Sequence, residues 1–125
     1  MAKRVIWSKN PTHEDLSAAR IYLSLICRPA RARTLVAKLR RTKAVNRTAK
    51  DLLRASGLPL LPRHEQHVAA DLKRTRKGKA LSPVLLVQGD MEHGVPLTVA
   101  DGYHRICASC HFDEDAVIVC RIARG

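Results

Sequence analysis

The amino-acid sequence predicts a small mixed α+β protein, and three observations support this fold class. Apolar residues recur at helical spacing through the first 77 residues, whereas three short runs rich in Val, Ile and Leu follow residue 83. Hydrophobic residues form 46% of the 125-residue chain, which is enough for a core and too much for a disordered protein. We therefore expect one compact unit with a sheet of three or four strands and an N-terminal layer of two or three helices.

The first two helices are expected in the N-terminal third of the chain. Thr12 should begin the first helix, because Asp15 three residues later completes a capping-box pattern. Apolar residues then recur on one face until Pro29, which we expect to end this helix. The second helix should cover about residues 31–42, with its apolar residues facing inward and basic residues on its other faces.

Two further helices are expected before the strands begin. Thr48 and Asp51 repeat the capping pattern, and Gly57 should stop the short helix that they start. Residues 58–62 form an apolar connector with two prolines, which favour extended backbone. A fourth helix is expected over about residues 64–77.

The C-terminal third should supply the sheet. Strands are expected over residues 84–87, 96–100 and 116–122, since these runs are short, apolar and rich in β-branched residues. A short helix, residues 103–111, should connect the second and third strands.

The junction at Asp101-Gly102 predicts an anion-binding site. The first amides of the following helix lack intrahelical partners, and the helix dipole is positive at that end. Gly102 allows a tight turn and a close approach of backbone to a phosphate. Arg105 can donate two parallel hydrogen bonds to phosphate oxygens, and His104 can donate another. The alternative is a capped helix in which Arg105 pairs with Asp101.

Positive charge is concentrated in the first half of the chain. The formal net charge is +12, and the run from Arg28 to Lys50 holds nine basic residues and no acidic one. Such a run favours a polyanionic partner, of which nucleic acid is the natural example, and RNA, an acidic protein or a nucleotide would also fit. A solvated helix face is the alternative. Aromatic residues form only 3% of the chain, which argues against a dedicated single-strand binder. The candidate nucleic-acid-binding residues are Arg31, Arg33, Lys38, Arg40, Arg41 and Lys43.

The sequence also favours a cytoplasmic protein that does not enter a membrane. We find no secretory signal at the N-terminus, and the longest apolar stretch, residues 21–27, is too short to cross a bilayer. Four cysteines in such a chain are expected to be reduced thiols. The oligomeric state stays open, with a dimer allowed.

Residues 97–108 carry a resemblance to the ParB/sulfiredoxin superfamily. They read Leu97-Thr98-Val99-Ala100-Asp101-Gly102-Tyr103-His104-Arg105-Ile106-Cys107-Ala108. Sulfiredoxins have Gly-Gly-Cys-His-Arg at this point, ParB-type proteins have Gly-Glu-Arg-Arg, and related serine kinases have Asp-Gly-His-His-Arg. The order of helix, glycine, proline and strand over residues 68–87 is also similar, so the resemblance covers roughly residues 63–122.

The resemblance implies a phosphate-binding region over residues 63–125, preceded by a basic helical region over residues 1–62. Its implied ligand is a nucleotide, ATP or CTP with Mg²⁺, and phosphotransfer or nucleotide hydrolysis are open activities. Tyr103 stands where sulfiredoxins have their nucleophilic cysteine, so sulfinic acid reductase activity is not expected. The implied phosphate-binding or nucleotide-binding residues are Asp101, Gly102, Tyr103, His104, Arg105, Lys73 and Arg76.

No catalytic residue can be assigned from these patterns, and the sequence leaves open whether the protein is an enzyme. Asp71 and Glu65 are candidates for a catalytic carboxylate by position only. The chain has neither a Walker loop nor a Gly-x-Ser-x-Gly elbow. A DNA-binding accessory or partition-like protein without catalysis, using the basic N-terminal helices, is the alternative function.

Two other motifs were weighed against these hypotheses. A pattern of residue types common in zinc sites is formed by His104, Cys107, Cys110 and His111. The last two are adjacent, so their side chains diverge on a helix, and we assign no metal ligands. Residues 48–76 resemble a helix-turn-helix, although the proline-containing connector is long for its turn.

Overall fold

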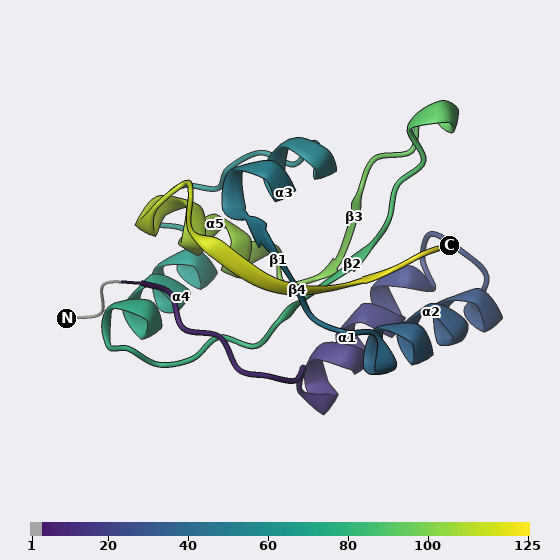
Figure 1. Cartoon of the computed structure of the whole chain (residues 1–125), viewed down its shortest axis with the longest axis horizontal. Helices are drawn as coiled ribbons and strands as arrows, with labels where there is room; N and C mark the ends of the chain where they lie inside the picture. The colour runs from purple at the N-terminus through teal and green to yellow at the C-terminus, as the bar shows by residue number, and fades with distance from the viewer. Residues whose placement is uncertain (1–3) are drawn as a thin grey trace.

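The computed structural model describes residues 4–125 and has an α+β fold built on a four-stranded mixed sheet (Figure 1). The strands are β1 (Val45–Thr48), β2 (Val84–Val87), β3 (Thr98–Asp101) and β4 (Val117–Ala123). Their order across the sheet is β1-β4-β2-β3, with β2 and β4 parallel and the two outer pairs antiparallel. The central strands are therefore the most apolar ones, as expected for strands that are covered on both faces.

Within residues 4–125, five α-helices and one 3₁₀-helix accompany the sheet. They are α1 (His13–Leu23), α2 (Pro29–Arg41), α3 (Ala49–Ser56), α4 (Gln66–Arg76), η1 (Met91–His93) and α5 (Tyr103–Phe112). The predicted capping box at the start of α1 is confirmed, since Thr12 and Asp15 exchange two hydrogen bonds of 3.0 Å.

The predicted end of the first helix was wrong. Helix α1 stops at Leu23, and Pro29 opens α2 at its first position instead of terminating α1. Proline suits this position, because its missing amide would have no helical partner there and its fixed φ matches a helix. Residues 24–28 therefore form a turn between two antiparallel helices.

The two faces of the sheet are covered by different helices. Leu85 packs with α1 and α2 in one apolar cluster, whereas Val84 and Leu86 pack with α3 and α5 in another. This alternation follows from the two-residue period of a strand. In Figure 1, α1 and α2 lie together below and to the right of the sheet, while α4 and α5 lie to its left and α3 lies above it.

Strand β1 was not predicted. Val45–Thr48 pairs antiparallel with β4, so the basic N-terminal region contributes an edge strand to the same sheet as the C-terminal region. The segment Val-Asn-Arg-Thr is short and mostly polar, which is how many edge strands look and why the apolar pattern missed it.

Helix α4 packs on α5 rather than forming a helix-turn-helix with α3. Val68 and Leu72 of α4 are buried against Cys107 and Ala108 of α5. Residues 57–65 separate α3 from α4, which is longer than the turn of that motif. Within residues 4–125, no helix has the length and apolar character needed to span a bilayer.

Candidate functional site

The start of α5 has the geometry expected at the strand–glycine–helix junction. Gly102 is the N-cap residue, with φ of +109°, a left-handed conformation that favours glycine. Thr12, Thr48 and Glu65 cap α1, α3 and α4 with their side chains. Among the described residues, no side chain caps α5. Its first amides are therefore available to an anion.

Arg105 is held by the protein itself. Its Nη2 donates to the Asp101 carboxylate at 3.2 Å and to the Pro83 carbonyl at 3.1 Å. Its Nη1 lies 3.7 Å from Asp15 of α1, and only 15% of the side chain is exposed. The guanidinium thus joins α5 to β3, α1 and the segment before β2. In this arrangement the guanidinium faces two carboxylates, which neutralise its charge, so it is not available to bind a phosphate.

The two carboxylates around Arg105 have pKa values shifted in opposite directions. Burial, together with the nearby Asp15, raises the pKa of Asp101 to about 6, although Arg105 opposes the shift. Burial would also raise the pKa of Asp15, but hydrogen bonds from Ser82 and Thr12 and the charge of Arg105 outweigh it, so its pKa is lowered. The pair therefore holds one carboxylate that protonates readily and one that stays ionised.

A cavity of about 240 Å³ opens beside the start of α5. Its ionisable lining residues are His67, Asp71, Asp101, His104 and Arg105. Burial raises the pKa of the Asp71 carboxyl, although the charge of Arg105 and the two histidines oppose this shift. The cavity is thus lined by carboxylates and imidazoles as well as by its single arginine, which is a mixed environment rather than a basic one.

Glu65 lies next to this cavity. Its carboxylate caps α4 through the amides of His67 and Val68, and Oε1 lies 3.7 Å from Nε2 of His104. Burial would raise the pKa of Glu65, but these amides and the histidines outweigh it, so its pKa is lowered. Glu65 and Asp71, named from the sequence by position only, both reach the surroundings of His104.

Other predicted residues lie outside the cavity. The Tyr103 hydroxyl donates to the Pro59 carbonyl, so this side chain anchors the connector between α3 and α4. Lys73 and Arg76 are exposed and, from the 3.6-residue helical period, point away from the cavity side of α4. His67 was missed, since a lone histidine in a helix carries no signal by itself.

A second and larger feature is a groove of about 670 Å³ between the end of α2, β1 and the chain after β4. We call it the basic groove, and its charged lining residues are Lys38, Arg41, Lys43, Arg47 and Arg124. Among the residues that the structure describes, no acidic one lines it, and its lining includes apolar residues such as Val45 and Ile122. Lys38 donates to the Arg124 carbonyl at 3.1 Å, which joins α2 to the C-terminal segment.

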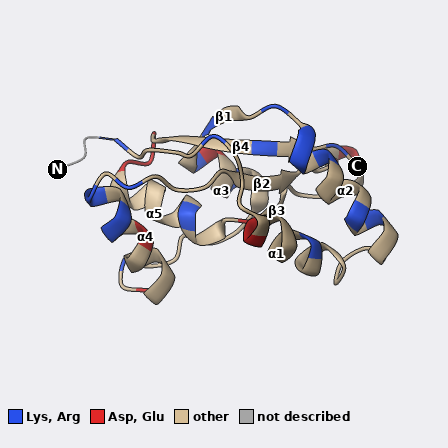
Figure 2. Cartoon of the chain, turned by 90° about the horizontal axis from the view of Figure 1, so that it is seen from below, with Lys and Arg blue, Asp and Glu red and all other residues tan. Residues whose placement is uncertain are grey.

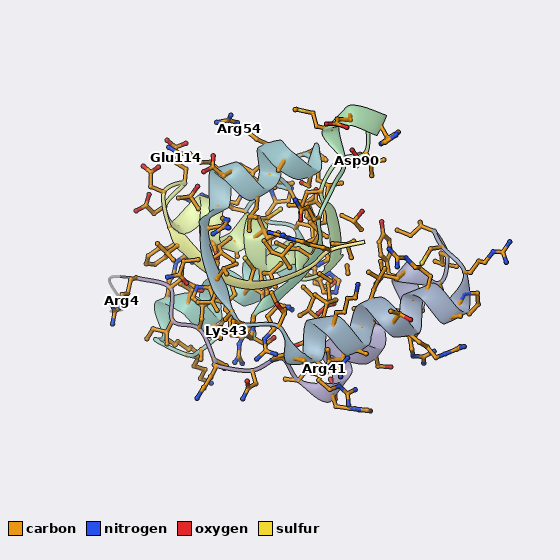
Figure 3. The ribbon with its side chains drawn as sticks, turned by 45° about the vertical axis from the view of Figure 1, so that its right-hand side comes forward. Arg4, Arg41, Lys43, Arg54, Asp90 and Glu114 are labelled. Atoms are coloured by element: carbon orange, nitrogen blue, oxygen red, sulfur yellow. The ribbon has the colours of Figure 1, made fainter. Side chains whose placement is uncertain are left out.

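The cations of the basic groove form no salt bridge with a carboxylate within the part of the chain that the structure describes. The salt bridges there involve other basic residues, namely Lys50, Arg54, His67, His93, His104 and Arg105. Figure 2 shows blue segments on α2 and on the segment that leads from it towards β1. In Figure 3, Arg41 and Lys43 lie at the lower edge of the molecule, whereas Asp90 and Glu114 lie at its upper edge.

The predicted nucleic-acid-binding residues are all exposed, but they divide between two hollows. Lys38, Arg41 and Lys43 line the basic groove. Arg33 and Arg40 line a neighbouring hollow of about 390 Å³, which also contains Arg20 and shares Arg41 with the groove. Arg31 lines neither hollow.

Arg47 and Arg124 of the basic groove were missed. Arg47 belongs to the basic run but lies on the unpredicted strand β1, and Arg124 reaches the groove only because β4 lies beside β1 in the sheet. Neither placement carries a local sequence signal.

Two of the four cysteines have the properties of core thiols. Cys107 and Cys120 are buried, and burial raises the pKa of Cys107 and raises the pKa of Cys120 to about 11. His111 contacts the Leu61 carbonyl at 2.6 Å instead of facing Cys107 or Cys110. The zinc-like letters over residues 104–111 therefore do not gather into one ligand set.

Comparison of the chain with protein-family models, with characterised proteins and with solved structures gives no match. The resemblance to the ParB/sulfiredoxin superfamily therefore stays a prediction.

Proposed function

We propose that this protein binds duplex DNA through the basic groove. One observation carries the proposal: within residues 4–125, five cations and no carboxylate line the groove. Such a surface recognises the regularly spaced phosphates of a nucleic-acid backbone, because cations there release the counterions of the polyanion. Among the described residues, no aromatic side chain lines the groove. Single-stranded bases stack on aromatic side chains, so this lining favours contact with a duplex backbone.

The neighbouring hollow extends the same surface. It shares Arg41 with the groove and adds Arg20, Arg33 and Arg40. Together the two hollows offer a continuous basic track across α2, which suits an extended ligand better than a single small anion.

The proposal is tested by charge reversal in the groove. The double variant Arg41→Glu/Lys43→Glu removes two phosphate contacts, each worth about eightfold at 0.1 M salt, so affinity for a duplex should fall roughly sixtyfold. Fluorescence anisotropy of a labelled duplex measures this change.

A matched control carries the same change of charge elsewhere. Arg54→Glu/Arg76→Glu alters two exposed arginines outside both hollows, and this variant should keep most of the affinity. Equal losses in the two double variants would show that only net charge matters and would reject the groove as the site.

A second candidate function is nucleotide binding at the cavity beside α5. The uncapped start of α5 favours it, since those amides face no side-chain partner among the described residues. Because Asp71 and Asp101 line the cavity, a phosphate there needs Mg²⁺ between it and the carboxylates. ATP or CTP with Mg²⁺ is thus the ligand to test, with phosphotransfer or hydrolysis as the activities that would follow.

Thermal unfolding with each nucleotide tests this second function. A rise in Tm is expected only when Mg²⁺ is present, and His104→Gln should reduce it. Arg105 is a poor choice for this test, because its loss removes the ion pairs with Asp101 and Asp15. The absence of a shift with ATP and with CTP would reject nucleotide binding.

A further inference from the structure

We infer that Glu65, His67 and His104 form a binding site for a zinc-type divalent cation. Within the described residues, these three side chains each bring a ligand atom to within 4.8 Å of the others. Two come from the start of α4 and one from the start of α5, so the site would join separate segments of the chain. This inference is independent of DNA binding at the basic groove.

The distances suit a tetrahedral ion. Oε1 of Glu65 lies 3.2 Å from Nδ1 of His67 and 3.7 Å from Nε2 of His104. Ligands bound to Zn²⁺ at about 2.0–2.1 Å stand about 3.3–3.4 Å apart at the corners of a tetrahedron. The two distances from Glu65 are therefore close to the required spacing before any ion is added, and the ligand atoms of the two imidazoles lie within 4.8 Å of each other. Side-chain rotation would complete the geometry, and His67 is exposed, whereas Glu65 and His104 are half-buried.

The donor set selects the class of metal. Two imidazoles and one carboxylate suit Zn²⁺ and its neighbours in the first transition row, whereas Mg²⁺ prefers oxygen ligands in octahedral geometry. The cation is thus distinct from the Mg²⁺ that a nucleotide would bring to the adjacent cavity. The His67 amide donates both to Oε1, the atom nearest the two imidazoles, and to Oε2 at 3.1 Å, so Oε2 can keep the cap of α4 when Oε1 binds an ion.

The surroundings supply an open position and an outer carboxylate. His67 and His104 both line the cavity of about 240 Å³, so an ion between them would have one side open to solvent or to an oxyanion. Asp71 lines the same cavity one helical turn after His67. Carboxylates in this position orient metal-bound imidazoles in many proteins.

The test is direct metal binding by the untagged full chain. Isothermal titration with Zn²⁺, and visible absorption with Co²⁺ as a spectroscopic substitute, should each report one tight equivalent. His67→Gln and His104→Gln should each weaken that equivalent at least tenfold. His64→Gln is the matched control, because His64 is exposed and lies beside Glu65 but outside the cluster.

The folded state of each variant is checked without metal by its thermal unfolding. In the wild type, Zn²⁺ should raise Tm and a chelator should reverse the rise, whereas the two cluster variants should lose the rise. Absence of a tight equivalent in the wild type overturns the inference. An equivalent that survives both cluster substitutions, or that His64→Gln removes, also overturns it.

Discussion

The basic groove and the start of α5 both contain arginines, but these arginines differ in exposure and in whether they have carboxylate partners. Arg105 lies among two carboxylates and a carbonyl, with 15% of its side chain exposed. The cations of the basic groove, such as Arg41, are exposed and lie in a lining without any carboxylate. Removing a charge that is paired within the fold leaves its partners unpaired and destabilises the protein, whereas a charge without an internal partner is available to a ligand.

Arg121 shows how close the two roles can lie in space. It is 8% exposed and donates to the Leu39 and Arg40 carbonyls at the end of α2, and also to the Asn10 side chain. A buried arginine thus hydrogen-bonds to the end of α2 on its inner side, while the arginines on its outer side have no carboxylate partner among the described residues. The position of an arginine relative to the sheet decides which role it has.

The largest expected effect is on the free energy of unfolding, which should depend on the paired Arg105 much more than on the exposed Arg41. Arg105→Met should lower the free energy of unfolding by about 3–5 kcal/mol, because it leaves Asp15 and Asp101 without their cation. Arg41→Met should change it by less than about 0.5 kcal/mol, since an exposed unpaired side chain loses little. Urea unfolding followed by the fluorescence of Trp7, the single tryptophan, measures both. Equal changes in the two variants would break the comparison.

A double variant sharpens this prediction. If the cost comes from unpaired carboxylates, Arg105→Met combined with Asp101→Asn should cost less than the sum of the two single changes. Additive costs would mean that Arg105 contributes through packing alone.

The turn before α5 should show the next largest effect. A Cβ at Gly102 would lie 2.9 Å from Arg105 Nη2 and 3.0 Å from Val84 Cγ2, and φ is +109°. Gly102→Ala should therefore cost about 2–3 kcal/mol of stability from strain and crowding together. Gly57→Ala is the control, because Gly57 is also left-handed but has nothing within 4 Å, so its cost should be about 1 kcal/mol. The same urea unfolding experiment compares them, and a smaller cost at Gly102 than at Gly57 would contradict the close packing.

A smaller effect is expected in the pH dependence. Because the pKa of Asp101 is raised to about 6 in the fold, above its value of about 3.9 in an unfolded chain, the folded state binds more protons between these values. Stability from this group therefore falls as pH rises from about 4 to about 6. The unfolding free energy of the wild type minus that of Asp101→Asn should decrease by about 1–2 kcal/mol over this range.

Asp15 is the control, because its contribution to stability should change with pH in the opposite direction. Its pKa is lowered in the fold, so its contribution is present above the unfolded pKa and is lost as pH falls through the folded pKa. The difference between the wild type and Asp15→Asn should thus decrease in acid. Parallel pH profiles for the two variants would show that the assignment of the shifts is wrong.

Local patterns were enough to predict much of the fold. Thr12 with Asp15 and Thr48 with Asp51 marked the starts of two helices, because capping is a contact between residues three positions apart. The strand at 84–87 was predicted to the residue, since its apolar run is bounded by Pro83 and a polar turn. Strand β1 was not, because a polar edge strand is defined by its neighbour β4 rather than by its own residues.

The site could be predicted only in part, for a related reason. The left-handed turn at Gly102 follows from the residue itself, and the position of His104 follows from the helix that begins there. The partnership of Arg105 with Asp15 joins residues 90 positions apart, and no local pattern signals it. The exposed basic run was predicted, whereas its assembly with Arg124 into a groove depends on the order of the strands.

The salt dependence of duplex binding tests the central claim most directly. If the five cations of the basic groove contact phosphates, the logarithm of the affinity should fall with the logarithm of salt concentration with a slope of about −4 to −5. In Arg41→Glu/Lys43→Glu the slope should shrink to about −2 to −3. An affinity indifferent to salt, or a slope that the double variant leaves unchanged, would contradict binding through the basic groove.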